Sequence, residues 1–347
     1  MRVGILTFHD TSNYGAMMQA YAVRQACANL GHETQVIDYR QRSTLQFYVK
    51  QALLEPPRVA QFRKWSSCRS FGRRRLSLTR PVRRRDQLWA LASGFDCLCV
   101  GSDQIWDATG HRGFNPEFFF DFADPDRTRL ISYAPSCGSM KPDRCPEPKL
   151  AGQLLGRFSN LSARDTNTQL CIRAWAGRDS ELVLDPTFLV DYDGFRDANT
   201  PKGEYVLVYA SRGGAMKAGI PASVGGFGLP VINAGFQAVP GAENRIGISP
   251  EAWVDLFRHA SCVITTFFHG AIFSTLFRKP FVALSDPGKS LKVGDLLGRL
   301  GLSDQLYSGG TAEDLVQAVR STDYTEAEPR IAAETERSRA YLAQALS

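Results

Sequence analysis

The clearest fold signal in this chain is the stretch Ala260-Ser-Cys-Val-Ile-Thr-Thr-Phe-Phe-His-Gly-Ala-Ile-Phe-Ser-Thr-Leu-Phe-Arg-Lys-Pro-Phe-Val-Ala-Leu284. Residues 262–266 form a β-branched run that is typical of a buried parallel strand, and residues 270–277 form an apolar run that suits a short helix. Pro280 ends that helix, because proline cannot continue its hydrogen bonding. The stretch therefore predicts strand, turn, helix and strand in succession, the repeating unit of a parallel α/β sheet.

His269 and Gly270 lie at the turn of this unit, directly after the predicted strand. Ligands of open α/β sheets bind beyond the carboxyl ends of the strands, where helix N-termini offer N–H groups to anions. Two interpretations of His269 follow. It either binds a ligand or is a buried histidine at a packed corner, which is the commoner case for a lone histidine.

Similar patterns extend in both directions and divide the chain into two α/β halves. A run of proline, glycine and acidic residues at 190–203 predicts the linker between them. Strands are predicted at residues 2–8, 33–39, 95–100, 118–122, 130–134, 205–210 and 229–233, and helices at 14–30 and 250–259.

We therefore expect an N-terminal α/β domain at residues 1–195, with a basic helical insert at 41–92, and a C-terminal α/β domain at 203–325. A last helix at 326–347 is expected to return across the linker. Two Rossmann-like, doubly wound halves of this kind describe a GT-B-like architecture with an interdomain cleft.

Positive charge is concentrated in one segment of the chain. Eleven Lys or Arg residues and no acidic residue lie between Arg58 and Arg85, so the remainder carries a net −5 once these eleven are removed from the overall +6.

Four interpretations of this basic segment compete: a solvated helical face, a platform for an anionic substrate, a membrane-surface patch, or a nucleic-acid contact. A charge run is most often the first. Nucleic acid is excluded as a partner, because aromatic residues are few and no stacking or groove-reading motif is present. A cytoplasmic leaflet attracts such patches with about 1 kcal/mol per basic residue, so peripheral membrane contact is a stronger alternative.

The eight cysteines include no CxxC pair, and most of them lie in apolar runs. Reduced cysteines that pack as small apolar side chains predict a cytoplasmic protein. No apolar run reaches the roughly 20 residues that a membrane-spanning helix needs. No set of His, Cys or carboxylate residues has metal-ligand spacing, so no metal is expected.

Polar loops follow two strands of the first half and one strand of the second half. They are His9-Asp-Thr-Ser-Asn-Tyr-Gly15, Gly101-Ser-Asp-Gln-Ile-Trp-Asp107 and Ser211-Arg-Gly-Gly214. Polar side chains at the carboxyl ends of strands are typical of a binding face. In the first loop, a helix cap through Ser12 or Asn13 is an equally good explanation. The glycine spacing of a dinucleotide fold or a P-loop is absent.

Several of these segments, taken together, resemble the polysaccharide pyruvyl transferases. The matching strings are Gly4-Ile-Leu-Thr-Phe8, Asn13-Tyr-Gly-Ala-Met-Met-Gln-Ala-Tyr-Ala22, Val100-Gly-Ser-Asp-Gln-Ile-Trp106, Asp185-Pro-Thr187, Phe268-His-Gly-Ala-Ile-Phe-Ser274 and Lys279-Pro-Phe281. The resemblance implies a GT-B-type enzyme that moves the enolpyruvyl carbons of phosphoenolpyruvate onto a sugar or lipid-linked glycan acceptor. Such enzymes usually form a pyruvate ketal across two hydroxyls and release phosphate. Phosphoenolpyruvate is then the donor substrate, and no cofactor is expected.

The resemblance also suggests roles for individual residues. His269 is expected to be the general acid toward C3 or the departing phosphate, and Asp103 the base that activates the sugar hydroxyl. Asp103 could equally be a turn residue that caps the next segment. The donor phosphate or carboxylate is assigned to Arg212 and the Gly270 N–H, with Lys279 as a weaker candidate. The acceptor side is assigned to Asn13, Tyr14, Gly15, Ser102 and Gln104.

The chain departs from the family pattern beside the motif histidine. Phe267 stands where the family commonly has Ser or Arg, and Thr266 where it often has Asp or Asn. Without an Arg at that position, either another cation binds the donor or the donor is held differently. Two rivals remain open: a GT-B glycosyltransferase whose glycine-rich segment 213–228 faces a nucleotide diphosphate, and a non-catalytic glycan-binding scaffold.

Overall fold

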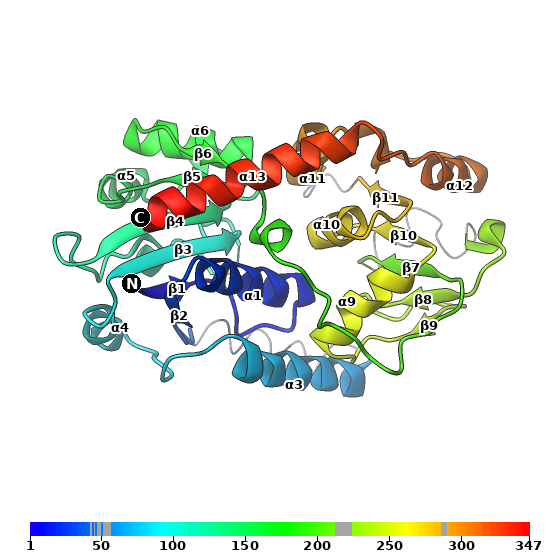
Figure 1. The fold of residues 1–347 in the computed structure, drawn as a ribbon, viewed down its shortest axis with the longest axis horizontal. Helices are drawn as coiled ribbons and strands as arrows, with labels where there is room; N and C mark the ends of the chain where they lie inside the picture. The colour runs from blue at the N-terminus through cyan, green and yellow to red at the C-terminus, as the bar shows by residue number, and fades with distance from the viewer. Residues whose placement is uncertain are drawn as a thin grey trace. The chain divides into compact units, whose positions relative to one another are not determined.

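The computed structural model describes residues 1–41, 44, 46, 50, 57–110, 112–211, 224–285 and 290–347. The chain divides into two compact units (Figure 1). Unit 1 comprises Met1–Val49, Arg69–Val190 and Ala333–Ser347, and unit 2 comprises Lys50–Cys68 and Asp191–Ala332.

Unit 1 is built on a four-stranded parallel sheet in the order β2-β1-β3-β4 (Figure 1). Its strands are β1 (Arg2–Leu6), β2 (Glu33–Val36), β3 (Cys97–Asp103) and β4 (Arg129–Pro135). Helix α1 (Tyr14–Asn29) connects β1 to β2, and its small and apolar side chains are buried. The expected strand–helix unit at the start of the chain is therefore present. The loop between β1 and α1 lies at the edge of the sheet where β1 and β3 have their carboxyl ends.

A further layer of unit 1 lies beyond β4. Helices α5 (Pro148–Leu155) and α6 (Thr166–Ala176) pack together there with a two-stranded parallel sheet of β5 (Ser162–Ala163) and β6 (Glu181–Leu182) (Figure 1). The strand predicted at residues 118–122 is wrong, because Pro116–Phe119 forms a 3₁₀ helix instead. Pro116 begins that helix and Phe120, at φ 55°, ends it, so the buried phenylalanine run packs as a turn.

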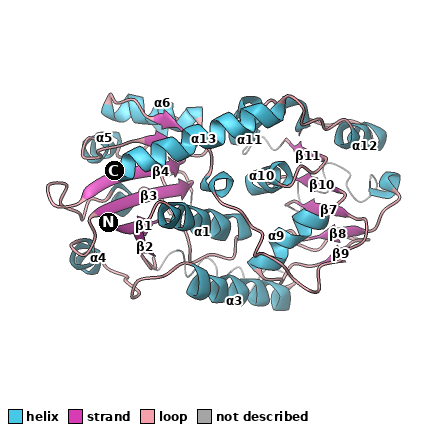
Figure 2. Ribbon diagram, in the orientation of Figure 1, coloured by secondary structure: helices cyan, strands magenta, loops and turns pink. Residues whose placement is uncertain are grey.

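Unit 2 contains a six-stranded parallel sheet in the order β12-β11-β10-β7-β8-β9. The strands are β7 (Val206–Tyr209), β8 (Val231–Asn233), β9 (Glu243–Asn244), β10 (Cys262–Thr265), β11 (Phe281–Leu284) and β12 (Leu306–Tyr307). The helices of this unit include α9 (Pro250–His259), α10 (Phe268–Leu276), α11 (Ser290–Arg299) and α12 (Ala312–Arg320). Figure 2 shows the strands of each unit side by side with helices around them. The expected β10–α10–β11 unit lies in the middle of this sheet.

The basic insert and the C-terminal helix each contribute to both units. Helix α3 (Arg58–Arg75) counts with unit 2 as far as Cys68, and its remainder counts with unit 1, as does α4 (Arg85–Ala92). The last helix, α13 (Ala327–Leu346), ends in unit 1, where Tyr341 Oη donates to Ser132 O at 2.9 Å. Within the described ranges, no helix is long and apolar enough to span a bilayer.

Candidate functional site

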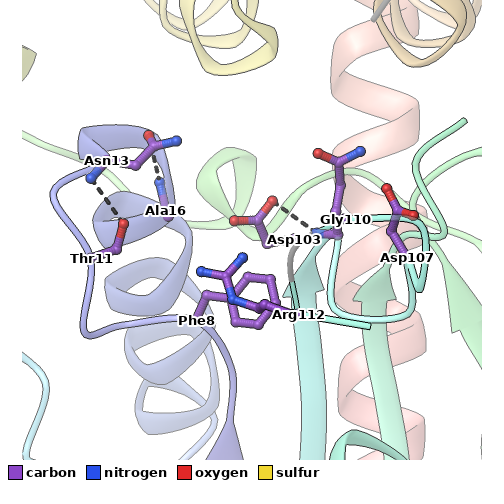
Figure 3. Close-up of a pocket in the computed structure, with 9 residues that line it drawn as sticks. Phe8, Thr11, Asn13, Ala16, Asp103, Asp107, Gly110 and Arg112 are labelled. Carbon is purple, nitrogen blue, oxygen red and sulfur yellow. Dashed lines mark hydrogen bonds between the residues drawn. The ribbon is translucent and has the colours of Figure 1, made fainter. Parts of the chain in front are cut away.

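A polar cavity of about 250 Å³ lies at the carboxyl end of the first sheet, beside α1 (Figure 3). Its walls come from the loop after β1, the start of α1, the end of β3 and the loop that follows β3. The lining residues are Phe8, Thr11, Asn13, Ala16, Asp103, Gln104, Asp107, Gly110 and Arg112. Two carboxylates, two amides, a hydroxyl, a guanidinium and one aromatic ring thus surround one small volume.

Asn13 is held at this cavity because it caps helix α1. Its Oδ1 accepts from the N–H of Gly15 at 3.0 Å and of Ala16 at 3.4 Å, and its own N–H donates to Thr11 Oγ1 at 3.0 Å. The two explanations offered for this loop therefore coexist, since the residue that caps the helix also lines the cavity.

Asp103 ends β3 in an unusual backbone conformation. Its φ of 75° lies in the left-handed region, which costs a non-glycine residue about 1 to 3 kcal/mol and is often found at functional sites. Its Oδ1 accepts from Gln104 N–H at 2.9 Å and lies 3.8 Å from Arg164 Nη2. The side chain keeps 17% exposure, so a positioned carboxylate faces the cavity (Figure 3).

A buried hydrogen-bond network supports Asp103 from below. Ser102 is fully buried, with Oγ 3.0 Å from Ala134 O and 3.2 Å from Asp185 Oδ2. Its N–H donates to Gln19 Oε1 at 3.2 Å. Arg164 links the network to the site, since its Nη1 donates to Asp185 Oδ2 at 3.0 Å while its Nη2 approaches Asp103. Buried polar groups satisfied in this way hold one arrangement of the strand end.

Not every residue assigned to the acceptor side reaches the cavity. Asn13 and Gln104 line it, whereas Tyr14, Gly15 and Ser102 are buried and are not among its lining residues. These three belong to the packing and hydrogen bonding behind the cavity wall.

Arg112 is the main cavity residue that sequence reasoning missed. Its guanidinium carbon lies 3.8 Å from the centroid of the Phe8 ring (Figure 3), and its Nε donates to Thr44 Oγ1 at 3.3 Å. The available signal was weak: a single arginine between Gly110 and Gly113, in the loop that follows the Gly101–Asp107 segment. Phe8 and Asp107 lay inside segments already singled out, but neither had been given a role.

A second, smaller cavity of about 20 Å³ shares Phe8 and Arg112 with the first. Beside it, Arg40 donates to Asp38 through Nε and Nη2 at 2.8 and 2.7 Å. Burial raises the pKa of Asp38, but hydrogen bonds from His9 and Arg40 outweigh it and lower the pKa to about 2. Asp38 thus fixes Arg40 as a second cation near the polar cavity.

In unit 2, His269 lies in the first turn of α10, beyond the carboxyl end of β10, and is 8% exposed. The residues around it are mostly aromatic. The Phe268 ring packs at 5.6 Å from its imidazole, and Phe267 packs on Tyr209 at 4.7 Å and on Phe236 at 5.3 Å. The position of His269 agrees with the sequence pattern, while its catalytic role stays a prediction.

The three predicted donor-binding groups differ in where they lie. Arg212 is outside the described residues. The Gly270 N–H donates to Phe267 O at 2.9 Å, and a Cβ at Gly270 would lie 2.0 Å from Thr265 Oγ1. Close packing against β10 therefore explains this glycine without a ligand.

Lys279 precedes β11, at the opposite edge of the sheet from His269. The nine residues of α10 separate the two edges by roughly 13 Å. Burial lowers the pKa of Lys279, as does the nearby Arg258. The structure does not bring Lys279 and His269 together at one edge.

Residues 13–286 match the sequence model of the polysaccharide pyruvyl transferases. The chain belongs to the polysaccharide pyruvyl transferase family. As a member of this family it is a transferase, and the family implies a sugar or glycan acceptor. The matched region includes Asn13, Asp103 and His269, so it covers most of the lining of the polar cavity of unit 1 and the β10–α10 turn of unit 2. No curated protein sequence gives a significant match.

Solved structures place this pyruvyl transferase family member in the GT-B fold, as expected. The UDP-N-acetylglucosamine 2-epimerase from Rickettsia bellii aligns with TM-score 0.54 and 11% identity, over 99% of this chain and 95% of the epimerase. The UDP-GlcNAc 2-epimerase from Neisseria meningitidis, bound to UDP-GlcNAc, aligns with TM-score 0.53 and 8% identity, over 100% and 99% of the two chains. At such identities the likeness concerns the fold alone.

The described part of this family member contains no cluster of three or more His, Cys, Asp or Glu residues that could hold a metal ion. Asp103 and His269 lie in different units, and the predicted interdomain cleft stays a prediction.

Proposed function

We propose that this protein transfers the pyruvyl group of phosphoenolpyruvate to a hydroxyl-bearing sugar or lipid-linked glycan precursor, forming a pyruvate ketal and releasing phosphate. The observation that carries the proposal is the family match over residues 13–286. The polar cavity of unit 1, most of whose lining residues lie in the matched region, supports it on the acceptor side.

The proposed reaction begins when an acceptor hydroxyl adds to C2 of phosphoenolpyruvate. The oxygen bonds to C2, the hydroxyl proton goes to a base, and C3 takes a proton from an acid. A second hydroxyl then bonds to C2 and gives its proton to a base, the bond between C2 and the phosphate oxygen breaks, and phosphate leaves. A base and an acid that act on different atoms are therefore required.

Asp103 is proposed as the base and His269 as the acid. Asp103 is supported by its partly exposed carboxylate, whose Oδ1 lies 3.8 Å from Nη2 of the buried Arg164. Asn13, Gln104 and Asp107 would bind sugar hydroxyls, while Phe8 and Arg112 would pack against the sugar ring. His269 is supported by its place at the start of α10 and by the ability of an imidazole side chain to transfer a proton.

Donor binding is proposed for cations, because phosphoenolpyruvate carries a phosphate and a carboxylate. Arg212 remains the proposed contact from unit 2. Phe267 supplies no charge at the position where the family commonly has Ser or Arg, so either another cation of the chain binds the donor or the donor is held differently.

We further propose a cytoplasmic site of action. All eight cysteines are buried and free, which is compatible with a reducing compartment.

The test is phosphate release by the purified protein from phosphoenolpyruvate, measured with a panel of sugar and lipid-linked acceptors. Acceptor-dependent release supports the proposal. A parallel panel of nucleotide sugars tests the rival glycosyltransferase, whose prediction is release of a nucleotide diphosphate. Absence of turnover with every donor would favour the glycan-binding scaffold.

A further inference from the structure

Helix α3 has two faces with different environments (blue, lower edge in Figure 1). Its inner face consists of Gln61, Lys64 and Cys68, spaced as one side of a helix, and all three are buried. The Gln61 side chain donates to Phe236 O, and Lys64 Nζ lies 3.6 Å from the centroid of the Phe236 ring. These contacts attach the first half of α3 to unit 2 and fix which face remains outside.

The outer face of α3 exposes apolar side chains. Val59 is 66% exposed and Phe62 is 56% exposed, three residues apart and hence neighbours on the helix surface. The half-buried Trp65 lies next along this side, with its ring 6.0 Å from that of Phe62. Isolated exposed apolar residues are common, but three neighbouring ones on a strongly basic helix call for an explanation.

Exposed Arg58 and Arg63 flank these apolar side chains, three further arginines lie in the last turn of α3, and the helix contains no acidic residue. The exposed cations of the helix are Arg58, Arg63, Arg73, Arg74 and Arg75. Lys64 points inward and does not add to this surface. The outer face of α3 is therefore cationic and apolar at once.

A solvated helical face explains the arginines but not the exposed Val59 and Phe62. A binding site for a soluble polyanion would likewise need only the charges. A helix with Arg on its polar side and Phe, Trp and an aliphatic residue beside them is typical of helices that lie in a membrane interface. The negative charge of anionic lipids is complementary to this surface.

We propose that the outer face of α3 docks this protein on an anionic lipid bilayer, with Val59 and Phe62 entering the headgroup boundary and the exposed arginines contacting lipid phosphates. Docking does not require pyruvyl transfer. If the proposed function holds, docking would bring the enzyme to the surface on which a lipid-linked acceptor is presented.

Vesicle co-sedimentation of the purified full-length protein tests the proposal. The native protein is expected to bind vesicles of phosphatidylcholine mixed with phosphatidylglycerol, not vesicles of phosphatidylcholine alone. Binding should weaken when salt rises from about 0.1 M to about 1 M, because exposed charges are screened. Equal binding to both kinds of vesicle would contradict the proposal.

Variants separate the two components of the surface. Phe62→Ser should weaken binding roughly tenfold through the lost apolar contact, whereas Leu170→Ser, a 60% exposed control on α6, should not. Changing Arg73, Arg74 and Arg75 together to Gln should weaken binding roughly 10²-fold. The matched control changes the exposed Arg127, Arg144 and Arg339 to Gln and should leave binding intact.

Insertion is tested directly with Phe62→Trp. Quenching of the added fluorescence by brominated lipids is the expected result, and it shows that the side chain reaches the bilayer. The proposal would be overturned if Phe62→Ser left vesicle affinity unchanged and a soluble polyanion bound with equal affinity. That result would show a purely electrostatic surface. Phosphate release with a soluble acceptor should be unchanged in these variants, so failure of docking and failure of the proposed function are distinguishable.

Discussion

The two units place different side chains at corresponding points of a strand–turn connection. In unit 1, β3 ends in Ser102 and Asp103, and a polar cavity follows. In unit 2, β10 is followed by Thr266 and Phe267, and Phe267 packs between Tyr209 and Phe236. The carboxyl end of a buried parallel strand thus presents a carboxylate in one unit and an aromatic cluster in the other.

Because of this difference, the two units offer different chemical groups to a ligand. The unit 1 site already contains hydrogen-bonding groups for a sugar, held by the network of Gln19, Ser102, Asp185 and Arg164. The described part of the unit 2 edge offers His269 among aromatic rings. We infer that acceptor recognition depends on unit 1 and that proton delivery depends on unit 2.

The largest expected effect is on turnover. Asp103→Asn and His269→Ala should each lower kcat by roughly 10² to 10⁴, because each removes a proposed proton-transfer group. Steady-state phosphate release measures this effect. Asp126→Asn and His32→Ala, on loops away from both sites, serve as controls. Full activity in either site variant, with its fold intact by circular dichroism, would remove that residue from the mechanism.

The next effect concerns the pH dependence of stability and comes from Lys64. Burial lowers its pKa from 10.5 to about 7 in the folded protein. Between these values the unfolded chain binds more protons, so the free energy of unfolding should rise with pH, by up to about 1.4 kcal/mol per pH unit.

Urea denaturation at pH 7 and pH 8 measures this slope. Lys64→Met should reduce it, and the difference between variant and native protein cancels the contributions of groups distant from Lys64. Identical slopes would mean that Lys64 keeps an ordinary pKa in the folded state.

The third prediction tests whether close packing, and not ligand binding, explains the glycine at the β10–α10 turn. Gly270→Ala should destabilise the protein by about 1 to 3 kcal/mol, because its Cβ would lie 2.0 Å from Thr265 Oγ1. Gly294→Ala in α11 is the matched control. Its Cβ would meet only Leu306 at 3.4 Å, so it should be neutral or stabilising. Equal melting temperatures for the two variants would argue against close packing at Gly270.

The smallest effect tests the role of Arg112. Arg112→Met retains an apolar contact with Phe8 but removes the guanidinium from the cavity. The acceptor KM should rise about tenfold while the donor KM changes little, if Arg112 serves the acceptor alone. A larger rise in the donor KM would instead assign Arg112 to phosphoenolpyruvate.

The sequence patterns predicted the long helices and strands. They also placed Asp103 and His269 at the carboxyl ends of strands. The apolar residues of α1 recur with the 3.6-residue period of a helix over about four turns, which was sufficient to predict it. For β10 the continuous β-branched run was sufficient, because such runs are typical of buried strands. The two-residue strands β5, β9 and β12 carry no period and could not be predicted. The phenylalanine run at 118–122 resembled a strand because burial alone does not distinguish a strand from a turn.

The candidate site was predictable only in part, since spacing along the chain does not show where a side chain points. Asn13, Asp103 and Gln104 line the cavity, while their neighbours Tyr14, Gly15 and Ser102 are buried beside it. Arg112 reaches the cavity from a loop without a motif. In the basic cluster, only the structure shows that Lys64 is buried while Arg63 is exposed.

The central claim is that phosphoenolpyruvate donates its three carbons after protonation at C3, and the most direct measurement is the reaction in D₂O with mass spectrometry of the product. The account predicts a ketal whose methyl group carries one deuterium from solvent, formed together with phosphate in equal amounts. A product that keeps the C3 methylene in a carbon–carbon double bond would contradict it. Transfer that depends on a nucleotide sugar instead of phosphoenolpyruvate would contradict it as well.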